Sequence, residues 1–170
     1  MYKVIVWTPL RASADACWDA GTDAAEVASL LPWGVRWEVS DPEGLRRALS
    51  EGGDRTFRTR LRLPGRVIDL PLRVVETRRG LRCAVGPAEG GGWELRVRFE
   101  RALGGRIRMV HELVLGEGGG RVAAELARWA LLRLHRALAA RLGGDAAPRG
   151  RCYVLSEAES GHGADLFRGA

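Results

Sequence analysis

The segment WELRVRFERALGGRIRMVHEL (residues 93–113) decides the fold, because two runs of alternating apolar and polar residues flank the pair Gly104-Gly105. A two-residue turn at the glycines would be the commonest short hairpin connection. It would place Val97 opposite Glu112 and Arg98 opposite His111, so that the apolar face of one strand would meet the charged face of the other. Because burial of one face sets the register of a strand, the simplest turn is excluded.

A three-residue loop at residues 103–105 resolves this conflict. Such loops usually combine a type I turn with a glycine bulge, and either glycine can take the left-handed conformation. With Ala102 opposite Arg106, the inward-facing residues oppose one another in the pairs Trp93–Leu115, Leu95–Leu113, Val97–His111 and Phe99–Met109. On the other face, Glu100 lies opposite Arg108 and Arg96 opposite Glu112, which adds two favourable charge pairs. We therefore expect an antiparallel hairpin with one buried face and one charged face.

His111 points inward in this register, among apolar side chains. It is either a core histidine that hydrogen-bonds a neighbour or a polar anchor in a ligand cavity, since pockets are mostly apolar with a few placed polar groups. Both interpretations stay open. In the second, the cavity lies between the sheet and the C-terminal helix, and its lining residues are Trp93, Leu95, Val97, Phe99, Met109, His111, Leu113, Ala130 and Leu134.

A helix of about six turns is expected at residues 121–142, ended by Gly143-Gly144. On a wheel of about 100° per residue, one broad face carries small and apolar residues and must lie on something apolar. These residues are Ala123, Ala127, Ala130, Leu131, Leu134, Ala137 and Leu138. The alanines either leave volume for a cavity or allow close packing on the sheet. The other side carries Glu125, Arg128, Arg133, His135 and Arg136, together with Trp129 and Leu132.

The segments before the hairpin are predicted to form strands and short helices. A strand at residues 2–8 precedes two short helices, at 13–21 and 23–32, with Ser13 and Asp23 as N-caps and with Gly21 and Pro32 at their ends. From residue 35 to 115 the pattern is period two, with a turn at Pro64-Gly65 that places Arg60 opposite Asp69. Pro71 indicates an edge or a bulge. The fold class expected is α+β, a curved antiparallel sheet wrapped around the long C-terminal helix.

Composition narrows the class of protein. The chain has 170 residues, 46% hydrophobic and 28% charged, which suits a globular domain with a real core. Asn and Gln are absent, and Lys3 is the only lysine among 27 basic residues. The net charge of +6 thus partly reflects a biased amino-acid composition and is weak evidence for a nucleic-acid partner. Weak affinity for anionic surfaces stays open.

Several kinds of site are unsupported by the pattern. Three scattered cysteines and three scattered histidines indicate no metal site, and we expect no cofactor. The glycine-rich stretches at 86–93 and 116–120 lack the Lys-Ser/Thr of a phosphate loop. We expect no transmembrane segment and no secretory signal, and we expect a bacterial, cytoplasmic protein with reduced thiols.

The order of the segments, with SADACWDAGTDAAEVASLLP (13–32), RFERALGGRIRMVHELVL (98–115) and ARWALLRLHRALAARL (127–142), resembles the START-like polyketide cyclase/dehydrase and lipid-transport superfamily, SRPBCC. The resemblance covers about residues 2–142. It implies a helix-grip fold whose sheet and C-terminal helix enclose a cavity for lipids, polyketides or other apolar molecules. It transfers no catalytic residue, because no invariant motif is matched.

Three functions follow from this resemblance. The leading hypothesis is binding or transport of a hydrophobic small molecule. An aromatase/cyclase-type enzyme is the alternative, with His111 as acid/base group and with Glu76 if that side chain faces inward. The third is a ribosome- or chaperone-associated interaction module that uses the arginine-rich outer strands.

The segment after the helix departs from the family pattern. We divide the chain into a ligand-binding domain at 1–143 and a tail at 144–170 that packs on the outer surface. Trp129 and Leu132 would expose apolar area on the helix, and the tail offers apolar residues to cover it. We expect residues 152–167 to pack there, with an edge strand at Cys152–Leu155; a homodimer through Trp129 and Leu132 is the alternative.

Overall fold

The structure is a computed structural model that describes residues 1–31, 34–52, 55–89, 92–116, 120–144 and 147–155. Its strands are β1 (Tyr2–Leu10), β2 (Arg36–Val39), β3 (Thr56–Phe57), β4 (Thr59–Leu63), β5 (Arg66–Asp69), β6 (Leu72–Arg78), β7 (Arg82–Pro87), β8 (Trp93–Ala102), β9 (Arg106–Leu115) and β10 (Arg149–Val154). Its α-helices are α1 (Ala14–Thr22), α2 (Ala24–Ser29), α3 (Pro42–Glu51) and α4 (Arg121–Leu142).

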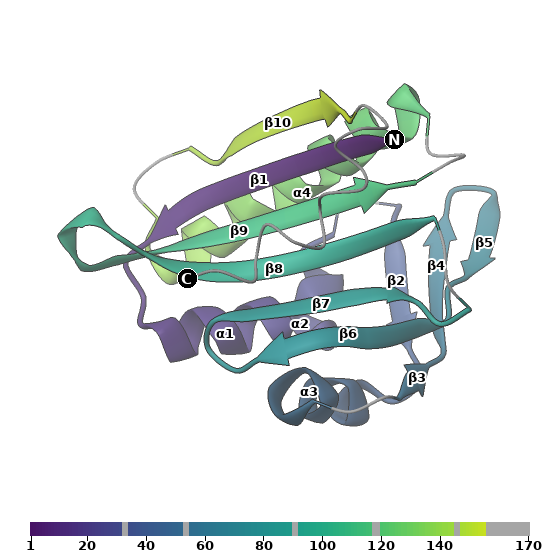
Figure 1. The fold of residues 1–170 in the computed structure, drawn as a ribbon, viewed down its shortest axis with the longest axis horizontal. Helices are drawn as coiled ribbons and strands as arrows, with labels where there is room; N and C mark the ends of the chain where they lie inside the picture. Colours follow the sequence, from purple (N-terminus) through teal and green to yellow (C-terminus); the bar gives the residue numbers. More distant parts are fainter. Residues whose placement is uncertain (32–33, 53–54, 90–91, 117–119, 145–146, 156–170) are drawn as a thin grey trace.

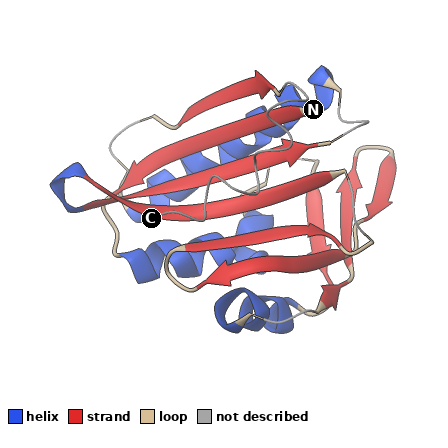
Figure 2. Cartoon of the chain, viewed as in Figure 1, coloured by secondary structure: helices blue, strands red, loops and turns tan. Residues whose placement is uncertain are grey.

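The large sheet has seven strands in the order β10-β1-β9-β8-β7-β6-β3, and its paired strands are antiparallel. The long helix α4 crosses behind β1 and β9 in Figure 1, with α1 and α2 on the same side below it. The helices and strands form two layers (Figure 2). A second sheet, β2-β4-β5, stands at one end of the large sheet. This is the expected α+β helix-grip architecture.

The β8–β9 hairpin has the register that the alternation predicts. Ala102 lies opposite Arg106, Phe99 opposite Met109 and Val97 opposite His111. The three-residue loop Leu103–Gly105 is a short 3₁₀ turn, in which Gly104 and Gly105 both have left-handed φ angles of 74° and 71°. A side chain at either glycine would strain this loop, so the predicted three-residue loop with left-handed glycines is confirmed.

The two short helices α1 and α2 are capped as expected, with one correction. The Ser13 hydroxyl accepts from Ala16 N, and Asp23 accepts from Ala25 N and Glu26 N. Gly21, however, lies inside α1 and does not follow its end. The reason is that Asp23 begins α2 directly, and its backbone N–H closes the last turn of α1 on Asp19 O.

Helix α3 is a departure from the period-two pattern, which predicts only strands in this region. The Asp41 side chain accepts from Gly44 N, Pro42 occupies the first turn, and Leu45, Ala48 and Leu49 are buried. The turn at Pro64-Gly65 does place Arg60 opposite Asp69, as predicted. At Pro71 the chain leaves the small sheet and enters the large one, because proline cannot continue a ladder.

Helix α4 has the expected bounds, but its buried face is rotated from the one expected. The buried residues are Ala124, Leu134, His135, Leu138 and Ala139, whereas Ala123 is exposed. His135, expected on the outer side, is completely buried. Small and apolar residues lie all around this helix, so the sheet decides which arc is covered.

The edge strand in the tail is present and starts three residues earlier than expected, at Arg149. It pairs with β1, and Gly150 lies beside Leu132: a Cβ there would lie 3.2 Å from Leu132 Cδ2. Trp129 remains 49% exposed. The remainder of the expected covering segment, 156–167, lies outside the described residues. In the described part of the chain, no helix has the length and apolar character to cross a membrane.

Candidate functional site: an apolar cavity with a histidine pair

A cavity of about 270 Å³, here called the central cavity, lies between the large sheet, α4 and the first three helices. The sheet contributes Cys83, Val85, Trp93, Leu95, Val97 and His111, and α4 contributes Leu131 and Leu134. Its remaining walls come from α1, α2, α3 and the small sheet, through residues that include Thr22, Val27, Leu45, Leu49, Trp37 and Thr59. The large sheet and α4 lie on opposite sides of this volume, and its lining is almost entirely apolar.

The structure brings together five of the residues expected to line a cavity. Trp93, Leu95, Val97, His111 and Leu134 all face the central cavity. The other four expected residues lie elsewhere, for the reasons that follow.

Phe99 and Met109 are buried deeper in the core, where α1 occupies the space. The Phe99 ring packs against Trp18 at a centroid distance of 5.5 Å. Gly21 comes so close that a Cβ there would lie 3.1 Å from Phe99 Cζ and 3.4 Å from Met109 Cε. This end of the hairpin is therefore filled by the protein itself.

Leu113 and Ala130 are also outside the lining. Leu113 packs in a second apolar cluster with Val4, Val6 and Ala124, between β1 and the first half of α4. Ala130 is half-buried and is not one of the lining residues. The cavity thus extends toward α2, α3 and the small sheet, and α4 lines it only through Leu131 and Leu134.

His111 has a buried partner that the sequence pattern does not reveal. His111 Nδ1 lies 2.9 Å from His135 Nε2, and the two rings meet edge to face, with an interplanar angle of 80°. His111 is 3% exposed and His135 is not exposed at all. A hydrogen bond between two neutral imidazoles needs one ring to donate and the other to accept.

Burial keeps both rings uncharged near neutral pH. It lowers the pKa of His111 to about 4. It also lowers the pKa of His135 well below the usual value, and the neighbouring His111 charge acts in the same direction. A charged imidazole here would lose its hydration, and no acid in the described part of the chain compensates for that loss.

Both threonine hydroxyls of the lining already have acceptors, and its cysteine is uncharged. The Thr22 hydroxyl donates to Trp18 O at 2.7 Å, and the Thr59 hydroxyl donates to Leu70 O. Burial, with a smaller contribution from Glu76, raises the pKa of the Cys83 thiol to about 12. This thiol is therefore protonated at neutral pH and is a poor nucleophile.

Glu76 does not face the central cavity. Its side chain is 44% exposed and pairs with Arg82 Nη2 at 2.5 Å. A bulge between Val74 and Glu76 interrupts the alternation of β6 at this point. His111 and Glu76, considered from the sequence as an acid/base pair, therefore do not lie in the same site.

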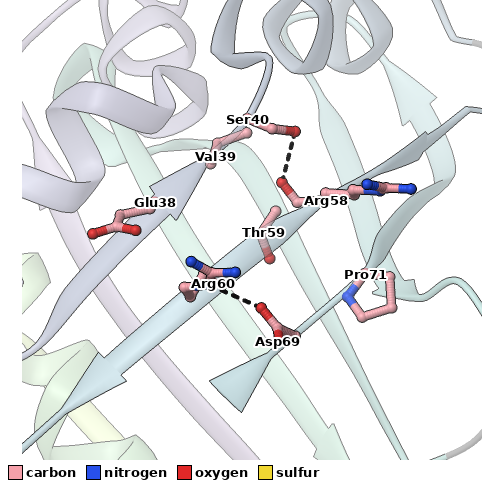
Figure 3. A pocket seen from close by; sticks show the side chains of 8 residues that line it. All are labelled: Glu38, Val39, Ser40, Arg58, Thr59, Arg60, Asp69 and Pro71. Carbon is pink, nitrogen blue, oxygen red and sulfur yellow. Dashed lines mark hydrogen bonds and ion pairs between the residues drawn. The ribbon is translucent and has the colours of Figure 1, made fainter. Parts of the chain in front are cut away.

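A larger hollow, of about 680 Å³, lies over the small sheet, and most of the residues that line it carry charged or hydroxyl groups (Figure 3). Arg60 Nε donates to Asp69 Oδ1 at 2.9 Å, and the Ser40 hydroxyl donates to Arg58 O at 2.9 Å. The side chains of Arg60 and Asp69 are 49% and 75% exposed to solvent. Because these groups satisfy one another in water, this hollow is a weaker ligand site than the central cavity.

The arginines on the far face of the large sheet are largely paired with acids. Glu112 is only 3% exposed and lies 2.9 Å from Lys3 Nζ, 3.4 Å from Arg98 Nη2 and 3.8 Å from Arg96 Nη1. Arg108 Nη1 lies 3.7 Å from Glu100 Oε2. The two predicted charge pairs are therefore present, and they reduce the free positive charge that a polyanion would need.

Comparison with solved structures identifies the fold. No family model and no curated protein matches the chain. A solved structure from Chromobacterium violaceum matches with a TM-score of 0.64 at 15% identity, over 85% of this chain and 100% of that chain. A START superfamily protein from Mycobacterium smegmatis matches with a TM-score of 0.59 at 16% identity, over 84% and 98%. A Thermus thermophilus protein matches at 0.58 and 18% identity, over 82% and 96%. The chain has the START-like fold that the resemblance implied.

Proposed function

We propose that the protein binds, and in that way stores or transports, a small apolar molecule in the central cavity. The observation that carries the proposal is the cavity itself, a volume of about 270 Å³ with an almost wholly apolar lining in a protein of only 170 residues. Well-packed interiors contain few voids larger than a water molecule. A cavity of this size left to water exposes its apolar lining and costs stability, which a ligand that displaces the water would recover.

The volume indicates the size of the ligand. Pockets for drug-sized molecules measure about 300–1,000 Å³. The central cavity is slightly below this range at about 270 Å³, so it suits a compact molecule such as a bicyclic ring system or a short acyl chain. The START-like fold supports the same class of ligand, since the resemblance implies cavities for lipids, polyketides and similar molecules.

The chemistry of the lining favours binding over cyclase-type catalysis. Efficient general acid–base catalysis needs a group whose pKa lies near the working pH. The pKa of His111 is lowered to about 4, and its ring partner is another buried imidazole rather than a carboxylate. Cys83 is held as a neutral thiol by its raised pKa. These groups suit orientation of a ligand better than proton transfer.

Binding is tested by filling the cavity. Val85 lines it from β7, so Val85→Phe adds a ring to the lining, whereas Val67→Phe makes the same change at a site on β5 that is 54% exposed. Indane, a bicyclic hydrocarbon, is titrated into each protein by NMR. We expect Val85→Phe to weaken indane binding about tenfold or more, equivalent to about 1.4 kcal/mol, while Val67→Phe binds as the unmodified protein does. Equal affinities in both variants would contradict the proposal.

A further inference from the structure

We infer that His135 fixes the proton of His111 on Nε2, so that the central cavity presents a hydrogen-bond donor and selects apolar molecules that carry a neutral oxygen acceptor, such as a ketone or an ether. This inference rests on the proposed function and deepens it. His135 is a positioning residue, because it acts on the ligand through His111. Two observations carry the inference: the connectivity of the pair and one nitrogen without a partner.

The connectivity leaves one nitrogen of each ring outside the pair. The 2.9 Å contact uses Nδ1 of His111 and Nε2 of His135. His111 lines the cavity, so Nε2 is the nitrogen of that ring left for a ligand. His135 does not line the cavity, and its Nδ1 is buried with no hydrogen-bond partner among the described residues.

The unpartnered nitrogen decides between the two possible arrangements. If His111 Nδ1–H donated, the His135 proton would sit on Nδ1, and a buried N–H would lack an acceptor. If His135 Nε2–H donates, Nδ1 of His135 keeps only a lone pair. Buried N–H groups without an acceptor are rarer than acceptors without a donor. The second arrangement therefore holds, and the proton of His111 is on Nε2.

The uncharged state of the pair determines which acceptor fits. Both imidazoles are neutral near pH 7 because burial lowers their pKa values. A carboxylate ligand would bring an unpaired charge into an apolar site, which is costly. The hydroxyl protons of Thr22 and Thr59 are already donated to backbone carbonyls. A neutral oxygen beside His111 Nε2 is thus the acceptor that the cavity accommodates.

The first experiment reads the proton positions directly, without any ligand. Long-range ¹H–¹⁵N NMR spectra distinguish protonated from bare ring nitrogens. We expect Nε2 of His111 and Nε2 of His135 to carry protons and both Nδ1 atoms to be bare. In His135→Leu, His111 loses its donor and should populate both tautomers. Protons on Nδ1 of both rings in the unmodified protein would overturn the inference, whatever the cavity binds.

The second experiment compares indane with 1-indanone, which has nearly the same shape and adds one carbonyl oxygen. The ratio of their dissociation constants is measured in the unmodified protein and in His111→Leu, so that differences in ligand hydration cancel. Loss of one hydrogen bond should reduce the preference for 1-indanone by roughly 2- to 10-fold. The double variant His111→Leu/His135→Leu, which leaves no buried imidazole without its partner, gives a second measurement if the single variant folds poorly.

The outcomes separate the two proposals. An unchanged preference for 1-indanone in both variants would overturn the inference while indane binding still supports the proposed function. If neither molecule binds the unmodified protein, the proposed function fails for ligands of this class, and the ligand selection inferred here fails with it. The NMR result then still tests the proton positions within the histidine pair.

Discussion

Acidification should destabilise this protein through its buried histidine pair. The unfolded chain protonates a histidine with a pKa of about 6.5, whereas burial lowers the pKa of His111 to about 4 in the folded protein. Between these values the unfolded state binds more protons, so the free energy of unfolding falls as the pH falls. The stability of the neutral pair is complete above a pH of about 6.5 and is lost progressively toward a pH of about 4.

The two pKa values of His111 give the size of the effect. From about pH 8 to about pH 5, the linkage relation gives a loss of about 2 kcal/mol for His111 alone. His135 adds to this loss, because its pKa is lowered by burial and by His111. About 2 kcal/mol is a large part of the roughly 5–15 kcal/mol typical of a domain.

Urea unfolding at these two pH values measures the loss, with His111→Leu/His135→Leu as the control. The double variant replaces both partners of the hydrogen bond and keeps the third histidine, His162, whose titration is then common to both proteins. We expect the unmodified protein to lose at least about 2 kcal/mol more than the double variant. Equal losses would refute the reasoning, since the pair would then not be neutral and buried.

Three other changes test the packing and the charges. Truncation after Gly144 removes β10 and uncovers Leu132 and the edge of β1, so we expect new dye binding or aggregation; truncation after Leu155, which keeps β10, is the control. Gly150→Val places a side chain 3.2 Å from Leu132 and Val6 and should lower the unfolding free energy by about 1–3 kcal/mol in urea melts, whereas Arg149→Val should not. Glu112→Gln removes the acid that Lys3 and two arginines surround and should cost about 1–3 kcal/mol, less at high salt.

The register of the β8–β9 hairpin could be predicted because its determinants are local. Alternation fixes which residues must face the core, and a slip of one residue would invert a strand. Gly104 and Gly105 are the only residues at the turn that adopt positive φ without strain. Local signals also explain why α4 has its predicted bounds. The hydrophobic pattern changes from period two to the helical period before Arg121, and Gly143, with φ 73°, ends the helix.

Helix α3 has local signals of its own, which the period-two pattern on either side of it obscures. Asp41 before Pro42 is typical of a helix start, and Gly52 after Glu51 is typical of its end. Leu45, Ala48 and Leu49 have the spacing of one helical face. These signals are sufficient to predict the helix when the segment is considered apart from its neighbours.

The histidine pair could not have been predicted from the sequence. The register of β9 places His111 inward, but the orientation of α4 about its axis depends on the sheet beneath it. Since Ala and Leu residues occur on every side of α4, the wheel does not show that His135 is covered. Likewise, the packing of α1 at Gly21, which fills the space beside Phe99 and Met109, is a tertiary contact without a local signal.

The proposed function is tested most directly by mass spectrometry of an organic extract from the freshly purified protein, with Val85→Phe purified in parallel. We expect a compact apolar molecule with a neutral oxygen, present in the extract of the unmodified protein and depleted in that of Val85→Phe. Extracts that contain the same molecules in the same amounts for both proteins would contradict the proposed function, because the larger side chain of the variant fills volume that a ligand of the central cavity needs.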